Sequence, residues 1–310
     1  MKTLKIIEKK NLWLLISLIV IGLGFWMMFS RSLKSEPILN YGIDFLGGTS
    51  LILKSDSLNK QHEINPDNVE NVNMKFIESI RHTLINYGID KSTIQITGEK
   101  EVLIKTLQLK DAKSQDLLNV IRKEHGDFEV LEIDFIGPTI GKELKEKSYL
   151  IIIFVVLFLL VYITFRFEWV YGVSAILALL HDGLITLSLS SILHLEINTA
   201  FVAGLLTVLG YSINDTIVIF DRVRENQKSL VEESDTQSFI ALTNLSLSQT
   251  LTRTINTSMT TLIVITSLIL FGGPTITGFC TVLLIGVISG TYSSLFIASP
   301  FVVMFNRFSK

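Results

Sequence analysis

The chain has 310 residues, of which 48% are hydrophobic, and its formal net charge at neutral pH is -2. Long runs without a charged residue, among them Trp13 to Phe29, exclude a soluble globular protein and are typical of an integral membrane protein. The single cysteine, Cys280, excludes an internal disulfide and a cysteine metal cluster, and no group of histidines and carboxylates has the spacing of metal ligands. We therefore expect neither a metal nor another cofactor.

The first predicted element is a transmembrane helix from Trp13 to Phe29, preceded by several lysines. Its apolar run is longer than the roughly 7 to 15 residues of the apolar part of a signal peptide, and no cleavage pattern of small residues follows it. Residues 1–30 are therefore predicted to form a cytoplasmic amino terminus and an uncleaved first transmembrane helix.

Residues 31–148 differ in composition from the apolar stretches. They contain many acidic and basic residues, and their hydrophobic residues follow short strand or helix patterns, as in a folded soluble domain. The predicted elements are, in order, a strand (Gly48 to Leu53), a helix (Val69 to Asn86), two strands (Thr93 to Gly98 and Glu101 to Thr106), a helix (Ala112 to His125) and a strand (Glu129 to Ile136). Ser55 to Asp67 is predicted to be a polar loop. The order βαββαβ is that of a ferredoxin-like α+β domain, here inserted between the first two transmembrane helices.

Five more transmembrane helices are predicted in residues 149–310, where charges are rare. They are Tyr149 to Phe165, Trp169 to Leu193, Ile197 to Phe220, Thr254 to Phe271 and Thr277 to Phe305. Thr139 to Lys147 is predicted to be a short polar helix that leads into the membrane, because Gly137-Pro138 ends the preceding strand. Residues 221–253 are predicted to form a charged cytoplasmic loop, in which Ser234 to Thr250 has a pattern typical of a helix on the membrane surface. The fold class is therefore a mainly α membrane protein with six transmembrane helices.

The distribution of basic residues predicts the orientation of these helices. If the amino terminus is cytoplasmic, one side of the membrane holds the amino-terminal lysines together with Arg166, Arg222, Arg224, Lys228, Arg253, Arg307 and Lys310. The short loops on the other side, His194 to Glu196 and Gly272 to Ile276, carry no lysine or arginine. Both termini are therefore expected in the cytoplasm, and residues 31–148 outside it.

The fourth predicted transmembrane helix contains one charged side chain, Asp215, between Ile197 and Phe220. A carboxylate at the centre of a bilayer costs about 2.5 to 3.5 kcal/mol on insertion scales, so such acids usually face a bundle interior and mark ion or proton paths. Asp215 is therefore the candidate proton carrier, and a structural hydrogen-bonding role is the alternative.

Two further charged residues are candidates for the same path. If the fourth helix ends near Asn226 and the fifth starts near Leu245, Arg253 and Asp215 each lie about two to three turns from the cytoplasmic ends, so the charge of Arg253 can act on the carboxylate. The alternative for Arg253 is an anchor at the membrane edge. Asp182, next to His181 in the third helix, either carries a proton or pairs structurally with the fourth or fifth helix, and the pairing is favoured.

The fifth helix also carries a stripe of hydroxyl groups at i, i+3 and i+4 spacing. Its members are Thr250, Thr254, Thr257 and Thr261. They either line a hydrated path or make hydrogen bonds between helices.

Four motifs in order along the chain resemble those of a known family. Tyr41 to Thr49 (YGIDFLGGT) resembles the segment that opens the exported domain of the SecD and SecF export proteins. The later motifs look like the SecF branch in particular: Gly137 to Gly141, Leu179 to Gly183, and Gly210 to Thr216 continuing through Asp221 to Asn226. The resemblance covers essentially the whole chain.

The resemblance implies a subunit of the bacterial protein-export machinery in the cytoplasmic (inner) membrane, with no enzymatic activity of its own. It implies that SecD, the SecYEG channel, YajC, YidC, the translocating polypeptide and membrane lipid are partners, that nucleic acid is not, and that the proton gradient drives the work. It also places a functional arginine at Arg253, within Ser248 to Thr254, and implies kinship with the resistance-nodulation-division exporters.

Two other classes of function remain open at this point. One is a lipid or small-molecule exporter subunit of the same superfamily, which the small size of the single outer domain disfavours. The other is an intramembrane aspartyl protease with Asp182 and Asp215 as its catalytic pair. Ser-Ile-Asn precedes Asp215, whereas such proteases carry Gly-x-Gly before the acid, so the protease is disfavoured as well.

Overall fold

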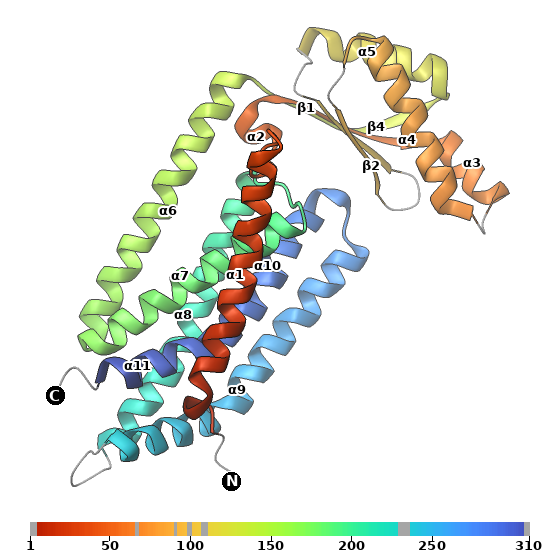
Figure 1. The fold of residues 1–310 in the computed structure, drawn as a ribbon. Helices are drawn as coiled ribbons and strands as arrows, with labels where there is room; N and C mark the ends of the chain where they lie inside the picture. Colours follow the sequence, from red (N-terminus) through yellow and green to blue (C-terminus); the bar gives the residue numbers. More distant parts are fainter. Residues whose placement is uncertain are drawn as a thin grey trace. The chain divides into compact units, whose positions relative to one another are not determined.

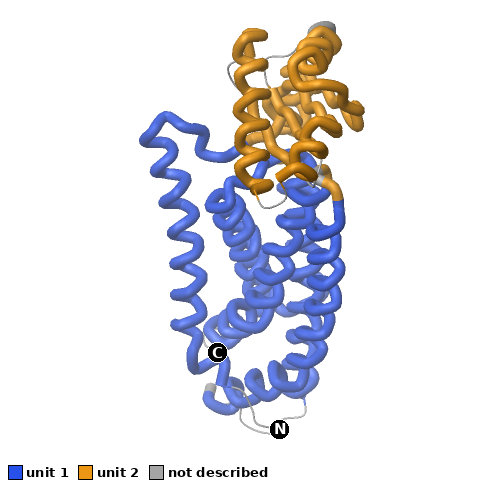
Figure 2. Tube along the Cα trace, turned by 90° about the vertical axis from the view of Figure 1, so that its right-hand side faces the viewer, with its two compact units in different colours: residues 1–40, 150–272, 276–310 blue, residues 41–149, 273–275 orange. Residues whose placement is uncertain are grey.

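A computed structural model describes residues 5–65, 68–89, 92–97, 101–106, 111–228 and 236–306 of the chain. The chain divides into two compact units (Figure 2). Unit 1 holds residues 1–40, 150–272 and 276–310, and unit 2 holds residues 41–149 and 273–275.

Six stretches of the described chain are long and apolar enough to cross a membrane, in agreement with the six predicted transmembrane helices. Their elements are η1 (Ile7–Lys9) with α1 (Lys10–Leu33), α6 (Pro138–Arg166), α7 (Trp169–Ile192), α8 (Thr199–Lys228), α9 (Thr236–Phe271), and α10 (Pro274–Ser293) with η3 (Ser294–Ala298) and α11 (Ser299–Asn306) (Figure 1). The third, fourth and sixth of these stretches are half or more buried, against less than a fifth for the others. The interior of unit 1 is therefore built around α7, α8 and α10.

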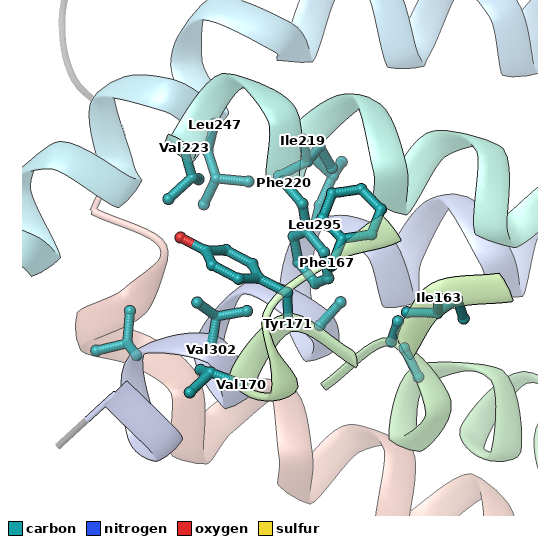
Figure 3. Packing of buried hydrophobic residues seen from close by; sticks show 14 of the residues in the cluster. Ile163, Phe167, Val170, Tyr171, Ile219, Phe220, Val223, Leu247, Leu295 and Val302 are labelled. Carbon is teal, nitrogen blue, oxygen red and sulfur yellow. The ribbon is translucent and has the colours of Figure 1, made fainter. Parts of the chain in front are cut away.

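A cluster of large apolar side chains holds one end of this interior together (Figure 3). The rings of Tyr171 on α7 and Phe220 on α8 meet edge to face, with centroids 5.2 Å apart. Phe167 packs against the same Phe220 ring at 6.2 Å. Because such aromatic pairs add to the free energy gained by burial, the cluster fixes α7 against α8.

Most described residues of the predicted cytoplasmic loop, residues 221–253, are helical. α8 continues to Lys228 and α9 begins at Thr236, so the predicted surface helix is the first part of α9. Asn226 of α8 donates hydrogen bonds to Ser246 (2.8 Å) and Gln249 (3.0 Å) of α9, and these polar contacts extend both helices beyond their apolar parts. Ser234 and Asp235 lie outside the described residues.

Two other transmembrane helices differ in detail from the prediction. The short helix predicted at Thr139 to Lys147 and the second transmembrane helix are one helix, α6. The sixth transmembrane helix contains a π-helical turn, Ser294–Ala298, where the hydroxyl of Ser299 donates a hydrogen bond to the carbonyl of Ser294 at 3.2 Å. π-Helical turns within α-helices are frequent at functional sites.

Unit 2 contains a four-stranded antiparallel sheet with the order β2-β3-β1-β4. The strands are β1 (Gly48–Ser55), β2 (Ser92–Thr97), β3 (Glu101–Thr106) and β4 (Phe128–Ile136), and the helices are α2 (Ile43–Leu46), α3 (Asp56–Ile64), α4 (Val69–Asn86) and α5 (Asp111–His125). Leu51 and Leu53 of β1, Leu84 of α4 and Ile121 of α5 are buried together and form the core of this unit.

The predicted polar loop from Ser55 to Asp67 is wrong, since Asp56–Ile64 forms α3. Ser55 caps this helix by accepting a hydrogen bond from the backbone N–H of Leu58 at 3.3 Å, and the Leu58 side chain is fully buried. A serine cap followed by one buried leucine stabilises a short helix whose other positions, apart from the exposed Ile64, are polar. Pro66 and Asp67 lie outside the described residues.

Candidate functional site

The interior of unit 1 contains a fully buried carboxylate, that of Asp182 on α7. Three serine hydroxyls donate hydrogen bonds to it: Ser212 of α8 to Oδ2 at 2.5 Å, Ser293 of α10 to Oδ2 at 2.7 Å, and Ser289 of α10 to Oδ1 at 3.0 Å. Hydrogen bonds of this number to one carboxylate offset much of the free-energy cost of burying it. Asp182 thus joins the three helices that form the interior of the bundle.

His181, the residue before it, extends this network to α1. Its Nδ1 atom lies 3.1 Å from Oδ1 of Asp182, and its Nε2 atom lies 2.8 Å from the hydroxyl of Ser17. The imidazole ring is stacked on the ring of Tyr292 of α10, with centroids 6.0 Å apart. The Tyr292 hydroxyl donates a hydrogen bond to the carbonyl of Trp13 at 2.7 Å.

The structural pairing of Asp182 that the sequence favours therefore exists, with one difference. The partners lie on the fourth and sixth transmembrane helices, and the fifth contributes none among the described residues. Serines are common in membrane helices and carry no distinctive signal, so Ser212, Ser289 and Ser293 are not singled out by sequence reasoning. The spacing of Ser289 and Ser293 by one helical turn is the one sign that they share a face.

Asp215 on α8 has the opposite environment. Its side chain is buried, with 4% of the residue exposed, yet its Oδ2 atom has no hydrogen-bond partner among the described residues. Ser212 precedes it by about one helical turn and uses its hydroxyl for Asp182. Asp215 is therefore a buried acid without the donors that stabilise Asp182.

Arg253 on α9 lies near enough to act electrostatically on Asp215, as the expected depth of the two residues requires. No described carboxylate lies within ion-pair distance of its guanidinium group. Its side chain is exposed on the surface of this chain, in contrast to the buried Asp215. A small displacement of α9 against α8 would thus change the strength of this electrostatic interaction.

The stripe of threonines on α9 is divided between two environments. Thr250 is buried and donates to the carbonyl of Ser246 at 3.0 Å, while Thr257 and Thr261 donate to carbonyls of their own helix from exposed or half-exposed positions. Thr254 is buried, and its hydroxyl has no partner among the described residues. Of the four, Thr254, which follows Arg253 in the sequence, is the one whose buried hydroxyl has no partner in the described part of the chain.

The Asp221 to Asn226 motif lies at the end of α8 and connects it to two other helices. Arg166 of α6 pairs with Asp221 at 3.3 Å, and Arg222 donates from Nε to Gln249 of α9 at 2.6 Å. These groups are partly exposed, so each pair contributes little stability by itself. Together they position the end of α8 relative to α6 and α9.

Two of the motifs meet within unit 2. Gly47 has a φ of 77°, and a side chain there would contact the backbone of Pro138 at 2.8 Å. A side chain at Gly141 would contact the backbone nitrogen of Gly47 at 2.9 Å. Glycine at both positions lets the start of α6 approach the turn before β1.

Among the contacts of the described chain, Asp182 and Asp215 do not share a hydrogen bond, and Asp182 is occupied by its three serine donors and by Nδ1 of His181. A catalytic aspartate pair needs two carboxylates that share one proton. Among the described residues, no group of three or more histidine, cysteine, aspartate or glutamate side chains is arranged to hold a metal ion.

Comparison with known proteins identifies the family. Residues 116–307 match the family model "Protein export membrane protein SecD/SecF, C-terminal". The protein translocase subunit SecF of Sebaldella termitidis is 34% identical over 99% of this chain and 93% of its own length. The SecF subunit of Desulfurispirillum indicum is 40% identical over 86% of this chain and 82% of its own length.

The fold is similar to that of SecDF, described as a translocon-associated membrane protein, from Thermus thermophilus. The crystal structure superimposes with a TM-score of 0.80 at 32% identity, over 97% of this chain and 38% of the SecDF chain. The chain thus spans about two fifths of the length of SecDF. These matches and the six transmembrane helices lead to one conclusion: the chain belongs to the SecF family of protein translocase subunits and is a membrane subunit of Sec protein export.

Proposed function

We propose that this chain uses the proton gradient to promote protein export, with Asp215 as the group that takes up and releases the proton. The observation that carries this proposal is the contrast between the two buried acids. Asp182 accepts hydrogen bonds from three serines, whereas Oδ2 of Asp215 has no partner in the described part of the chain and Arg253 acts on Asp215 electrostatically. A carboxylate in such a position changes its charge at the least structural cost.

Arg253 gives the charge of Asp215 a mechanical consequence. An ionised Asp215 attracts the guanidinium group, and a protonated Asp215 does not. The two residues lie on α8 and α9, so each proton that binds and leaves changes the force between these helices. Asp182 belongs to the same proton-transport region, where its serine contacts hold α8 against α7 and α10 while Asp215 titrates.

SecD is the partner that this arrangement favours. On α8 the exposed stripe contains Asn214 beside Asp215, and on α9 Arg253 and Asn256 are exposed within the membrane-spanning stretch. Polar groups at this depth are costly in lipid, so a second membrane subunit covers them. The same proposal includes the SecYEG channel, YajC and YidC, the translocating polypeptide and the surrounding lipid as further partners, and no catalytic activity for this chain.

Unit 2 is proposed to be a ferredoxin-like domain between the first and second transmembrane helices. Its sheet order, β2-β3-β1-β4 with antiparallel neighbours, supports this assignment. The positive-inside distribution supports a location outside the cytoplasm for residues 31–148, with both termini cytoplasmic in the bacterial inner membrane and residues 149–310 completing the bundle. Arg307 and Lys310, which contribute to that distribution, lie outside the described residues.

The test is export of a secreted reporter from cells depleted of the native subunit. Asp215→Asn keeps the size of the side chain and removes its ability to release a proton, so gradient-driven export should fail. Asp134→Asn, at an exposed position of β4, is the matched control and should support normal export. Normal export by Asp215→Asn at a normal protein level would show that Asp215 is not the carrier.

Neither of the two alternative functions, a lipid or small-molecule exporter subunit and an aspartyl protease, is favoured. Copurification with SecD separates an export subunit from a small-molecule exporter.

A further inference from the structure

Among the histidines that the structure describes, His181 alone is buried, and both of its ring nitrogens have partners within the transmembrane bundle. It is 8% exposed, and Asp182 beside it is fully buried. Nδ1 faces Oδ1 of Asp182 at 3.1 Å, and Nε2 faces the Ser17 hydroxyl at 2.8 Å. Imidazole is the side chain that changes charge nearest to neutral pH, so the state of this ring matters.

Counting hydrogens at Asp182 shows which nitrogen carries one. Ser212, Ser289 and Ser293 all donate to this carboxylate, which is the arrangement that an ionised carboxylate requires, since it only accepts hydrogen bonds. The lone pair of an unprotonated Nδ1 would be repelled by Oδ1. Beside an ionised Asp182, Nδ1 of His181 therefore carries a hydrogen and donates it to the carboxylate.

The second nitrogen has two possible states, and Ser17 accommodates both. The Ser17 hydroxyl lies 2.8 Å from Nε2 and 3.2 Å from the carbonyl of Trp13. If the hydroxyl donates to Nε2, the ring is neutral. If Nε2 carries a hydrogen and donates it to Ser17, the ring is an imidazolium and the hydroxyl donates to Trp13 instead. Rotation of one hydroxyl thus admits an additional proton without displacing a heavy atom.

We propose that His181 is a second proton-binding site of the bundle, in which Asp182 holds the imidazolium and Ser17 switches its hydrogen bond as the proton binds. The groups that face the ring are Asp182 on its own helix, Ser17 on α1 and Tyr292 on α10, and the carbonyl of Trp13 accepts from both Ser17 and Tyr292. On α8, Ser212 contacts Asp182 of α7. Asp215 follows Ser212 by about one turn and is the acid of α8 that lies nearest to this contact in the sequence.

Charge balance supports an imidazolium at this position. An isolated charge in a membrane interior is costly, but a protonated His181 and an ionised Asp182 form a neutral, fully hydrogen-bonded pair. Through its hydrogen bonds the pair connects α1, α7, α8 and α10. Ser293, which donates a hydrogen bond to Asp182, directly precedes the π-helical turn. A proton bound by His181 therefore acts, through Asp182 and Ser293, on the place where the sixth transmembrane helix departs from α-helical geometry.

The experiment is solid-state NMR of the full chain in lipid bilayers with ¹⁵N-labelled histidine, recorded between about pH 5 and pH 8. The chain has five histidines, and the signal that disappears in His181→Gln belongs to His181. We expect a titrating imidazolium whose proton affinity falls at least about tenfold in Asp182→Asn, a shift of the midpoint by one pH unit or more. Ser17→Ala should lower the affinity about threefold or more, since it removes the acceptor for the second nitrogen.

Ser174→Ala is the matched control, because the Ser174 hydroxyl on the same helix bonds only the carbonyl of Val170 in the described chain. It should leave the midpoint unchanged. A His181 ring that stays neutral down to pH 5, or a midpoint that is the same in Ser17→Ala as in the parent protein, overturns the proposal; Ser17→Ala decides if Asp182→Asn does not fold. The result is independent of the role proposed for Asp215, because His181 is titrated directly and Asp215→Asn should retain its signal.

Discussion

Ser212 of α8 donates a hydrogen bond of 2.5 Å to Oδ2 of Asp182 on α7. Ser212 lies about one helical turn before Asp215 on the same helix, and Oδ2 of Asp215 has no hydrogen-bond donor in the described part of the chain. The anchored acid is suited to holding helices together, and the acid without donors is suited to binding a proton. Two carboxylates in one bundle thus differ in role because their hydrogen-bond donors differ.

Replacement of Ser212 tests the anchor. Ser212→Ala removes one of the donors to a fully buried carboxylate, and we expect it to lower the free energy of unfolding by about 1 to 3 kcal/mol. The measurement is thermal unfolding of the purified protein in detergent. Ser267→Ala is the control, since Ser267 is exposed and bonds to its own helix. An equal midpoint for both variants would contradict the anchoring role.

Close approach of α8 and α10 depends on Gly286. A side chain added there would overlap the Cγ2 atom of Val208. Gly286→Ala should therefore destabilise the bundle by about 1 to 3 kcal/mol, and the double variant Gly286→Ala/Val208→Ala should recover part of the loss. Gly278→Ala, where nothing lies within 4 Å, is the control in the same thermal assay. Failure of the second substitution to restore stability would show that this contact is not the cause.

Arg253 should be required as a charge and, in part, as a guanidinium group. Arg253→Ala removes the cation that acts on Asp215, and we expect gradient-driven export to slow at least about tenfold, which corresponds to about 1.4 kcal/mol. Arg253→Lys keeps the charge and loses the planar fork, so it should retain intermediate activity. Reporter secretion at matched protein levels measures both. Full activity of Arg253→Ala would reduce this residue to a membrane-edge anchor.

Unit 2 should lose stability in acid near His125. Burial lowers the pKa of His125, and the nearby Glu124 carboxylate opposes this effect. Because the folded pKa lies below the unfolded value of about 6.5, protonation favours the unfolded state, and stability falls as the pH drops below that value. Thr83 of α4 contacts Nε2 of His125 at 2.7 Å, so the loss should appear where α4 meets α5.

Hydrogen exchange of the full chain, corrected for the intrinsic effect of pH on exchange, measures this change. Peptides from α4 and α5 should lose protection between pH 7.5 and pH 5.5 in the parent protein. His125→Gln cannot be protonated in this range and should remove the pH dependence. Equal pH dependence in the two proteins would assign the effect to other groups.

Local patterns in the sequence determine much of this molecule. The six transmembrane helices follow from apolar runs long enough to span a bilayer, and α4 and β3 begin and end where the sequence predicts, because periodicity is a property of neighbouring residues. The position of Asp215 as the lone acid of its helix is likewise visible in the sequence, since a charge among apolar residues is conspicuous.

The tertiary structure alone decides the partners of the buried groups. Ser293 is 111 residues from Asp182, and Ser17 is 164 residues from His181, and a serine in a membrane helix has no local feature that reveals its partner. The difference between a saturated acid at Asp182 and an unsatisfied acid at Asp215 depends on which helices pack together. That packing is set by the shapes of whole helix faces, so the chemistry of the two acids could be assigned only when the folded bundle was known.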